Sequence, residues 1–200
     1  MKKIGIMGGT FDPIHIGHLT AAESAREACR LDEVWFIPAA APPLKNKTPG
    51  ASARNRYEMT QLATEGNPFF KALDMELRRE GVSYSIDTVQ QLKDEHPGCS
   101  FSFIIGSDRV NDLPKWHRIR ELADSVDFIG LERPSDPLST EGLPSYLKER
   151  LRLIDMPPIG ISSTELRECL ATGTSVRYLV PDSVYAYIRR NRLYGSATND

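Results

Sequence analysis

Residues 8–18 read Gly-Gly-Thr-Phe-Asp-Pro-Ile-His-Ile-Gly-His, and they join a short apolar segment to an alanine-rich one. Ile4 and Ile6 alternate with small residues in an opening strand, and residues 18–30 suit a helix. Glycines between a strand and a helix let backbone N–H groups approach an anion, and the helix N-terminus adds a partial positive charge. The stretch therefore predicts a phosphate-binding turn at the end of the first strand.

The order of strand, helix and strand recurs along the chain. Further apolar strands are expected at 34–37, 69–73, 101–105, 126–131 and 151–154, with helices at 52–64 and 86–96 between them. Short apolar strands that alternate with helices are typical of parallel pairing. The fold class is therefore predicted as α/β, a Rossmann-like, doubly wound parallel sheet with flanking helices.

The C-terminal part of the chain is predicted to be helical. One helix is expected to start at Ser162 and end near Gly173, and an amphipathic helix is expected at 182–192. We expect one domain over residues 1–200, with a Rossmann-like core at 1–160 and a small C-terminal helical addition at 161–200. Proline-containing loops are expected at 38–47 and 133–144, and the tail after Gly195 is expected to fray.

Composition narrows the class of protein. The 200 residues include 25 Lys and Arg against 27 Asp and Glu, a net charge of −2, and 40% are hydrophobic. A globular protein is expected, and the balanced charge argues against binding a nucleic acid polymer. No secretory or membrane-spanning segment is expected. Three cysteines without a CxxC pair indicate reduced thiols in a cytoplasmic protein.

His15 and His18 are the first candidates for chemistry. Because they are three residues apart at the start of the expected helix, both can point toward its mouth and donate hydrogen bonds to phosphate oxygens. The alternative is a glycine turn that carries two surface histidines. A zinc site is disfavoured because no further ligand of suitable type lies nearby.

A second cluster spans Ile161–Arg167, with the sequence Ile-Ser-Ser-Thr-Glu-Leu-Arg. Ser162 with Glu165 fits a capping box, so these residues have a purely structural interpretation as a helix cap. Ser163 and Arg167 are four apart, however, and would share one face at the positive end of that helix. Together with the histidines, a hydroxyl and a guanidinium there suit a ligand that carries several phosphates.

With both clusters in view, the chain resembles the HxGH nucleotidyltransferase superfamily, which shares its nucleotide-binding core with class I aminoacyl-tRNA synthetases. Residues 8–19, GGTFDPIHIGHL, look like the bacterial nicotinate-nucleotide adenylyltransferase family. The likeness continues through residues 79–88, 103–108, Trp116 and residues 156–167, so it covers about 160 residues. Two departures stand out: Leu44 replaces the histidine of the usual Pro-Pro-His-Lys, and Ser107 stands where alanine is usual.

The resemblance implies adenylyl transfer from ATP to nicotinate mononucleotide, giving nicotinate adenine dinucleotide (deamido-NAD) and pyrophosphate in NAD biosynthesis, without a covalent intermediate. The attacking phosphate is already ionised, so no side chain has to deprotonate it and no catalytic triad is needed. Mg²⁺ is expected to enter on the phosphates of ATP rather than in a metal cage of the protein.

Site residues follow from the matched motifs. Expected catalytic residues are His15, His18, Lys45 and Arg167; the expected ATP site comprises Gly8, Gly9, Thr10, His18, Gly106, Asp108, Ser162, Ser163, Thr164 and Arg167; and the expected nicotinate mononucleotide site comprises Thr10, Phe11, Asp12, His15, Lys45, Thr88 and Trp116.

Several of these residues also have a structural interpretation. Asp108 could be a helix N-cap rather than a ribose ligand, and Trp116 could be a core residue rather than a platform for the pyridine ring. Arg79 and Arg133 are interpreted as solvated surface charges.

Two other functions stay open at this point. One is a related transferase such as phosphopantetheine adenylyltransferase, which would share both phosphate clusters. The other is a non-catalytic nucleotide sensor. The sequence leaves a homo-oligomer open as well.

Overall fold

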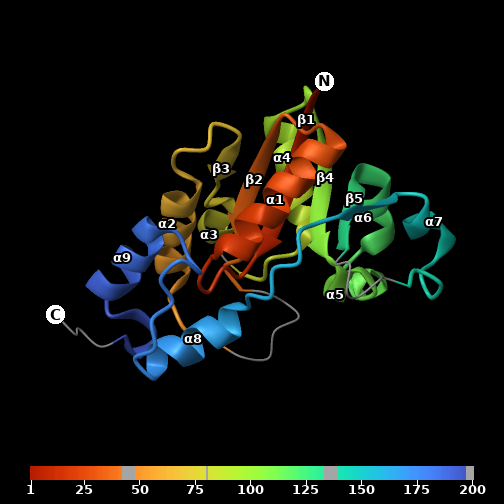
Figure 1. Cartoon of the computed structure of the whole chain (residues 1–200). Coiled ribbons are helices and arrows are strands. Elements are labelled where there is room, and N and C mark those ends of the chain that lie inside the picture. Colours follow the sequence, from red (N-terminus) through yellow and green to blue (C-terminus); the bar gives the residue numbers. More distant parts are fainter. Residues whose placement is uncertain (42–47, 80, 133–138, 197–200) are drawn as a thin grey trace.

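The centre of the computed structural model is a six-stranded sheet whose strands all run parallel (Figure 1). The strands are β1 (Lys2–Gly9), β2 (Glu33–Pro38), β3 (Phe70–Ala72), β4 (Cys99–Gly106), β5 (Asp127–Glu132) and β6 (Leu151–Asp155), in the order β3-β2-β1-β4-β5-β6. The structure describes residues 1–41, 48–79, 81–132 and 139–196, and of Asp108 only the backbone. The predicted α/β class and the Rossmann-like order are confirmed.

Helices cover both faces of this sheet, as Figure 1 shows. The helices are α1 (Ile16–Cys29), α2 (Ala53–Thr64), α3 (Met75–Arg79), α4 (Ser85–Glu95), α5 (Ser107–Val110), α6 (Ile119–Ser125), α7 (Ser145–Lys148), α8 (Ser163–Ala171) and α9 (Asp182–Arg190), with short 3₁₀ turns η1 (Leu113–Lys115) and η2 (Leu193–Gly195). Buried residues of α1, α2, α8 and α9 pack in one cluster, and those of α3 to α7 in another.

Strand alternation explains why two cores form. Ile4 and Ile6 of β1 belong to one buried cluster and Met7 to the other, because successive side chains of a strand point to opposite faces. In β2, Phe36 and Ile37 divide in the same way. Both faces of the central strands are therefore apolar, and the sequence accordingly reads as short continuous apolar runs.

The strand order places the reversal of winding between β1 and β4. The chain moves outward from β1 to β2 and β3, and then returns to continue on the other side through β4, β5 and β6. Gly8 and Gly9 end β1, and Gly106 ends β4. A crevice at the carboxyl ends of the strands is expected at such a point, because the two crossovers leave in opposite directions.

Every strand predicted from the sequence is present, but several short helices were missed. The predictions contained nothing between 105 and 126, where α5, η1 and α6 lie, and nothing for α3 or α7. These elements have three to seven residues, too few to show a helical period. Residues 42–47 and 133–138 of the two predicted loops lie outside the described residues, as do the tail residues 197–200, whereas Ser196 is buried.

Across residues 1–41, 48–79, 81–132 and 139–196, no helix has the length and apolar character needed to cross a membrane.

Candidate active site

A cavity of about 820 Å³ opens at the carboxyl edge of the sheet. Residues from the ends of β1, β2, β4 and β5 line it, together with the first turns of α1, α4 and α8. The volume lies in the range of cavities that hold small organic ligands.

Most of the residues predicted as site residues line this one cavity. They are Gly8, Gly9, Thr10, Phe11, Asp12, His15, His18, Thr88, Gly106, Trp116, Ser162, Ser163, Thr164 and Arg167. Lys45 and Leu44 lie outside the described residues. The backbone of Asp108 lies inside α5, whose N-cap is Gly106, so the alternative of Asp108 as an N-cap is wrong.

The two histidines stand together at the N-terminus of α1. His15 is the N-cap residue, and its ring stacks on that of His18 with centroids 3.7 Å apart. The backbone N–H of His15 donates to Nδ1 of His18 at 3.3 Å, so a neutral His18 carries its proton on Nε2. A Cβ at Gly17 would lie 3.0 Å from Nδ1 of His15, a tight contact that would require the His15 ring to shift.

His15 is uncharged near neutral pH. Its side chain is buried, with 5% exposed, and this burial lowers its pKa to about 4. Nδ1 of His15 has no hydrogen-bond partner among the described residues. A buried polar atom without a partner is costly, and here the atom lies against Gly17.

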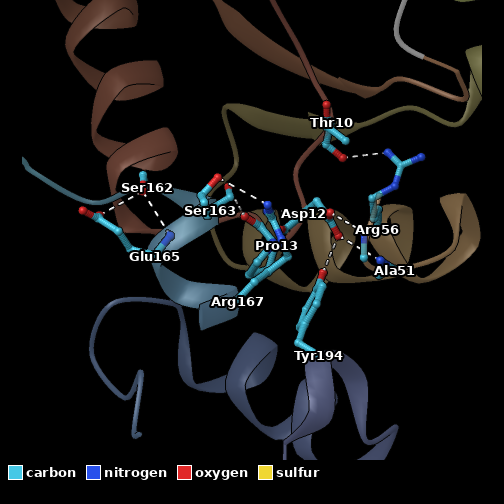
Figure 2. A network of polar contacts seen from close by, with 12 residues as sticks. Thr10, Asp12, Pro13, Ala51, Arg56, Ser162, Ser163, Glu165, Arg167 and Tyr194 are labelled. Carbon is cyan, nitrogen blue, oxygen red and sulfur yellow. Dashed lines mark hydrogen bonds and ion pairs between the residues drawn. The ribbon is translucent and has the colours of Figure 1, made fainter. Parts of the chain in front are cut away.

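The turn between β1 and α1 is anchored by Asp12. Its carboxylate accepts hydrogen bonds from the backbone N–H groups of Gly50 (2.7 Å) and Ala51 (3.0 Å) and from the hydroxyl of Tyr194 (2.8 Å), as Figure 2 shows in part. The carboxylate is therefore engaged by protein donors, although Asp12 also lines the cavity.

A buried arginine holds the same turn from the other side. Arg56 of α2 has 1% of its surface exposed and donates to the carbonyl of Thr10 at 2.6 Å, as Figure 2 shows. It also donates to the carbonyl of Ala40 at 3.4 Å. Burial lowers the pKa of this guanidinium, and the Asp12 charge opposes that shift. The sequence analysis missed Arg56, because nothing in the pattern of α2 distinguishes it from exposed Arg54.

The N-terminus of α8 confirms the predicted helix cap and places Ser163 and Arg167 at the cavity, where phosphate binding stays a prediction. The Ser162 hydroxyl accepts from the backbone N–H of Glu165 at 3.2 Å and donates to its carboxylate at 2.9 Å, which is the predicted helix cap. Ser163 donates to the carbonyl of Pro13 at 2.9 Å, and Arg167 donates to that of Asp12 at 2.8 Å. These bonds hold the start of α8 against the Asp12–Pro13 turn (Figure 2). Asp12, Ser163 and Arg167 also line the cavity.

The opposite end of the cavity is formed by α3, α4 and the Trp116 segment. Thr88 is buried and donates to the carboxylate of Glu76 at 2.6 Å. Burial raises the pKa of Glu76. Arg79 was predicted to be a solvated surface charge, and this is wrong: it is half-buried and donates to the Thr88 hydroxyl at 3.0 Å. Arg133 lies outside the described residues.

Trp116 packs against the core and also faces the cavity, and its role as a platform for the pyridine ring stays a prediction. Its ring packs edge-on against Phe103, with centroids 5.7 Å apart, and it also lines the cavity. The sequence analysis did not single out Glu76, Tyr84, Ser85 or His117, which line the same end. Tyr84 and Ser85 stand in the motif of residues 79–88, which was the available signal, and Ser85 begins α4.

Acidic and metal-binding side chains are sparse in this cavity. The part of the chain that the structure describes contains no group of three or more His, Cys, Asp and Glu residues that could hold a metal ion. The cavity is lined by His18, Ser163 and Arg167, whose side chains are of types that can donate hydrogen bonds to phosphate oxygens.

Comparisons with known proteins agree with this geometry. Residues 6–169 match the cytidylyltransferase-like family model. A probable nicotinate-nucleotide adenylyltransferase of Oceanobacillus iheyensis is 51% identical over 199 residues, which cover 100% of both chains. A protein of the same description from Bacillus pumilus is 45% identical over 196 residues, 98% of this chain and 100% of the relative.

Solved structures share the fold. Nicotinic acid mononucleotide adenylyltransferase of Plasmodium falciparum, complexed with NaAD, superposes with a TM-score of 0.79 and 24% identity over 98% of this chain and 99% of the other. The same enzyme complexed with APC gives a TM-score of 0.77, also at 24% identity, with the same coverage of both chains.

Proposed function

This chain belongs to the nicotinate-nucleotide adenylyltransferases of the cytidylyltransferase-like family, and we propose that it transfers the adenylyl group of ATP to nicotinate mononucleotide. A 5′-phosphate oxygen of the mononucleotide attacks the α-phosphorus of ATP. The bond from that phosphorus to the bridging oxygen breaks, and pyrophosphate leaves with the electron pair. The products are nicotinate adenine dinucleotide and pyrophosphate, and no proton has to be removed from the nucleophile.

One arrangement carries the proposal: the N-termini of α1 and α8 meet at the switch point between β1 and β4. They bring His15, His18, Ser163 and Arg167 to one cavity. Two helix N-termini and a guanidinium offset the repulsion between two anionic substrates, which is the main obstacle to this reaction.

The ATP phosphates are assigned to the α8 side of the cavity. His18, Arg167 and the Ser162–Thr164 turn bind the phosphate chain, and the Gly8–Gly9 backbone allows it to approach β1. His18 donates from Nε2 to the charge that develops in the transition state. Gly106 and Asp108 are assigned to the adenosine end, and Lys45 to the phosphates.

Nicotinate mononucleotide is assigned to the other side. The turn Thr10–Asp12 and His15 lie beside its phosphate, with Asp12 shaping the turn through its backbone contacts rather than binding the ligand. Trp116 supplies a flat face for the pyridine ring. Thr88 and the first turn of α4, which begins at Ser85, are supported as the carboxylate-binding end, because a helix N-terminus favours a negative charge.

Mg²⁺ is proposed to enter with ATP, held by phosphate oxygens and water, where it would neutralise charge on the leaving pyrophosphate. The donor set supports this assignment, since the described residues offer no acidic cluster to hold the ion.

We further propose one domain over residues 1–200, because buried residues of α8 and α9 share a cluster with Met7 of β1. A cytoplasmic location is supported by three free cysteines.

The test is an assay of pyrophosphate release from Mg²⁺-ATP with nicotinate mononucleotide, nicotinamide mononucleotide or phosphopantetheine as acceptor. Release with nicotinate mononucleotide, and much less with the others, is expected. Release with phosphopantetheine alone would replace the proposed acceptor. No release with any acceptor, from a protein that still binds ATP, would point to a nucleotide sensor instead.

A further inference from the structure

Tyr194 joins the C-terminal part of the described chain to the phosphate-binding turn. It belongs to η2, after α9, and its hydroxyl donates to Oδ1 of Asp12 at 2.8 Å across 182 residues of sequence (Figure 2). Asp12 is 4% exposed, and both burial and the Asp12 charge raise the pKa of Tyr194. The hydroxyl therefore stays protonated and acts as a fixed donor to a buried carboxylate.

The donors around Asp12 divide into uncharged and charged ones. Gly50, Ala51 and Tyr194 meet the carboxylate oxygens within 3.0 Å. Nη1 of Arg167 remains 3.7 Å from Oδ2 and instead donates to the Asp12 carbonyl at 2.8 Å. The hydrogen bonds to the Asp12 carboxylate thus come from uncharged donors, and the Arg167 guanidinium stays beyond hydrogen-bond distance of it.

We propose that Tyr194 is a positioning residue for the transfer reaction: its hydroxyl satisfies Asp12 and so leaves the Arg167 guanidinium available to the substrate phosphates. The inference rests on the proposed function, because it assigns Arg167 to phosphate. Without the Tyr194 donor, the buried carboxylate would lack one hydrogen bond, and among the described residues Arg167 is the cation close enough to replace it.

Packing supports the link between Tyr194 and Arg167. A Cβ at Gly50 would lie 3.1 Å from the Tyr194 ring and 3.0 Å from Cδ of Arg167, so the two side chains close over the same glycine. Tyr194 itself has φ 60 and ψ 24, a left-handed conformation that a residue other than glycine adopts at a cost. In this conformation the hydroxyl donates to Asp12.

The experiment compares Tyr194→Phe with Tyr187→Phe. Tyr187 of α9 also donates to a carboxylate, that of Glu58 at 2.6 Å, and it does not line the cavity. Both variants lose one tyrosine–carboxylate hydrogen bond. We expect kcat/KM for ATP to fall about tenfold in Tyr194→Phe, with weaker ATP binding by calorimetry, and to stay within about twofold of wild type in Tyr187→Phe.

A double-mutant cycle separates positioning from general destabilisation. If Tyr194 acts through Arg167, adding Tyr194→Phe to Arg167→Met should lower kcat/KM by less than about twofold further. The inference would be overturned if Tyr194→Phe lowered kcat/KM by the same factor in the wild type and in Arg167→Met. Identical effects of Tyr194→Phe and Tyr187→Phe would overturn it as well.

Gly50→Ala provides a second test, in which Tyr194 keeps its hydroxyl group. The added methyl should displace Tyr194 and Arg167 and weaken ATP binding, whereas Gly98→Ala, where a Cβ meets nothing within 4 Å, should not. Unchanged ATP binding in a folded Gly50→Ala protein would count against the inference. If the wild-type protein binds ATP but releases no pyrophosphate, the proposed function is contradicted. The inference about Tyr194 is then still tested by the measurements of ATP binding.

Discussion

The His15 and His18 rings stack at 3.7 Å, and the backbone N–H of His15 fixes the tautomer of His18 by donating to its Nδ1. His18 is thus oriented before substrate arrives. A donor that is oriented in advance does not have to reorganise during the reaction. This geometry therefore suits a group that stabilises charge in the transition state.

His18→Ala is therefore expected to lower kcat by about 10² to 10³ fold while changing the dissociation constant for ATP much less. Steady-state kinetics and calorimetry measure the two quantities. His96→Ala is the matched control, because His96 packs on Trp35 and does not line the cavity. Equal losses in turnover and in ATP binding would show that His18 acts on the ground state only.

The buried His15 predicts how stability depends on pH. Its folded pKa of about 4 lies below the ordinary value of 6.5, so between these values the unfolded chain binds the proton and the folded chain does not. Stability from this group is complete above about pH 6.5 and declines as pH falls toward 4, by up to about 3 kcal/mol. Urea unfolding between pH 7.5 and 4.5 should show a steeper loss for wild type than for His15→Asn. Parallel curves would exclude this linkage.

Arg56→Met is expected to destabilise the fold by about 3 kcal/mol, because it leaves the carbonyls of Thr10 and Ala40 without their buried donor. Arg54→Met on the same helix removes an exposed ion pair with Glu58 and should lower the free energy of unfolding by less than about 1 kcal/mol. Denaturant unfolding measures both. Similar losses in the two variants would mean that the burial of Arg56 contributes little.

Thr88→Val tests the far end of the cavity. Valine keeps the volume of the side chain but removes the hydroxyl that donates to Glu76. The free energy of unfolding is therefore expected to fall by about 1 to 3 kcal/mol. If this end receives nicotinate mononucleotide, its KM should rise more than that of ATP. Thr60→Val, a buried threonine whose hydroxyl donates within α2, should leave both KM values unchanged. A larger rise in the KM of ATP would place the two substrates the other way round.

Much of the fold was predictable because apolar periodicity is local. The strands at 34–37 and 101–105 needed only their own residues to be recognised, and the doubly wound parallel class followed from their alternation with helices. The seven residues of α6 were missed, since fewer than two helical turns produce no reliable pattern.

The residues that line the cavity were predictable where they lie close together in sequence. His15 and His18 share one helix turn, and Ser163 and Arg167 share another, so short spacings revealed them. The supporting contacts were not predictable in this way: Asp12 takes its donors from residues 38, 39 and 182 positions away. Nothing local to Arg56 indicates burial, because the carbonyls that it serves belong to other segments.

The contact between Asp12 and Tyr194 also has a consequence for synthesis on the ribosome. The glycine turn emerges among the first residues, but the hydroxyl that satisfies its carboxylate is added 182 residues later. Closing so long a loop depends on the intervening sheet already having brought the two segments together. A nascent chain shorter than 194 residues therefore lacks one donor to its earliest functional segment.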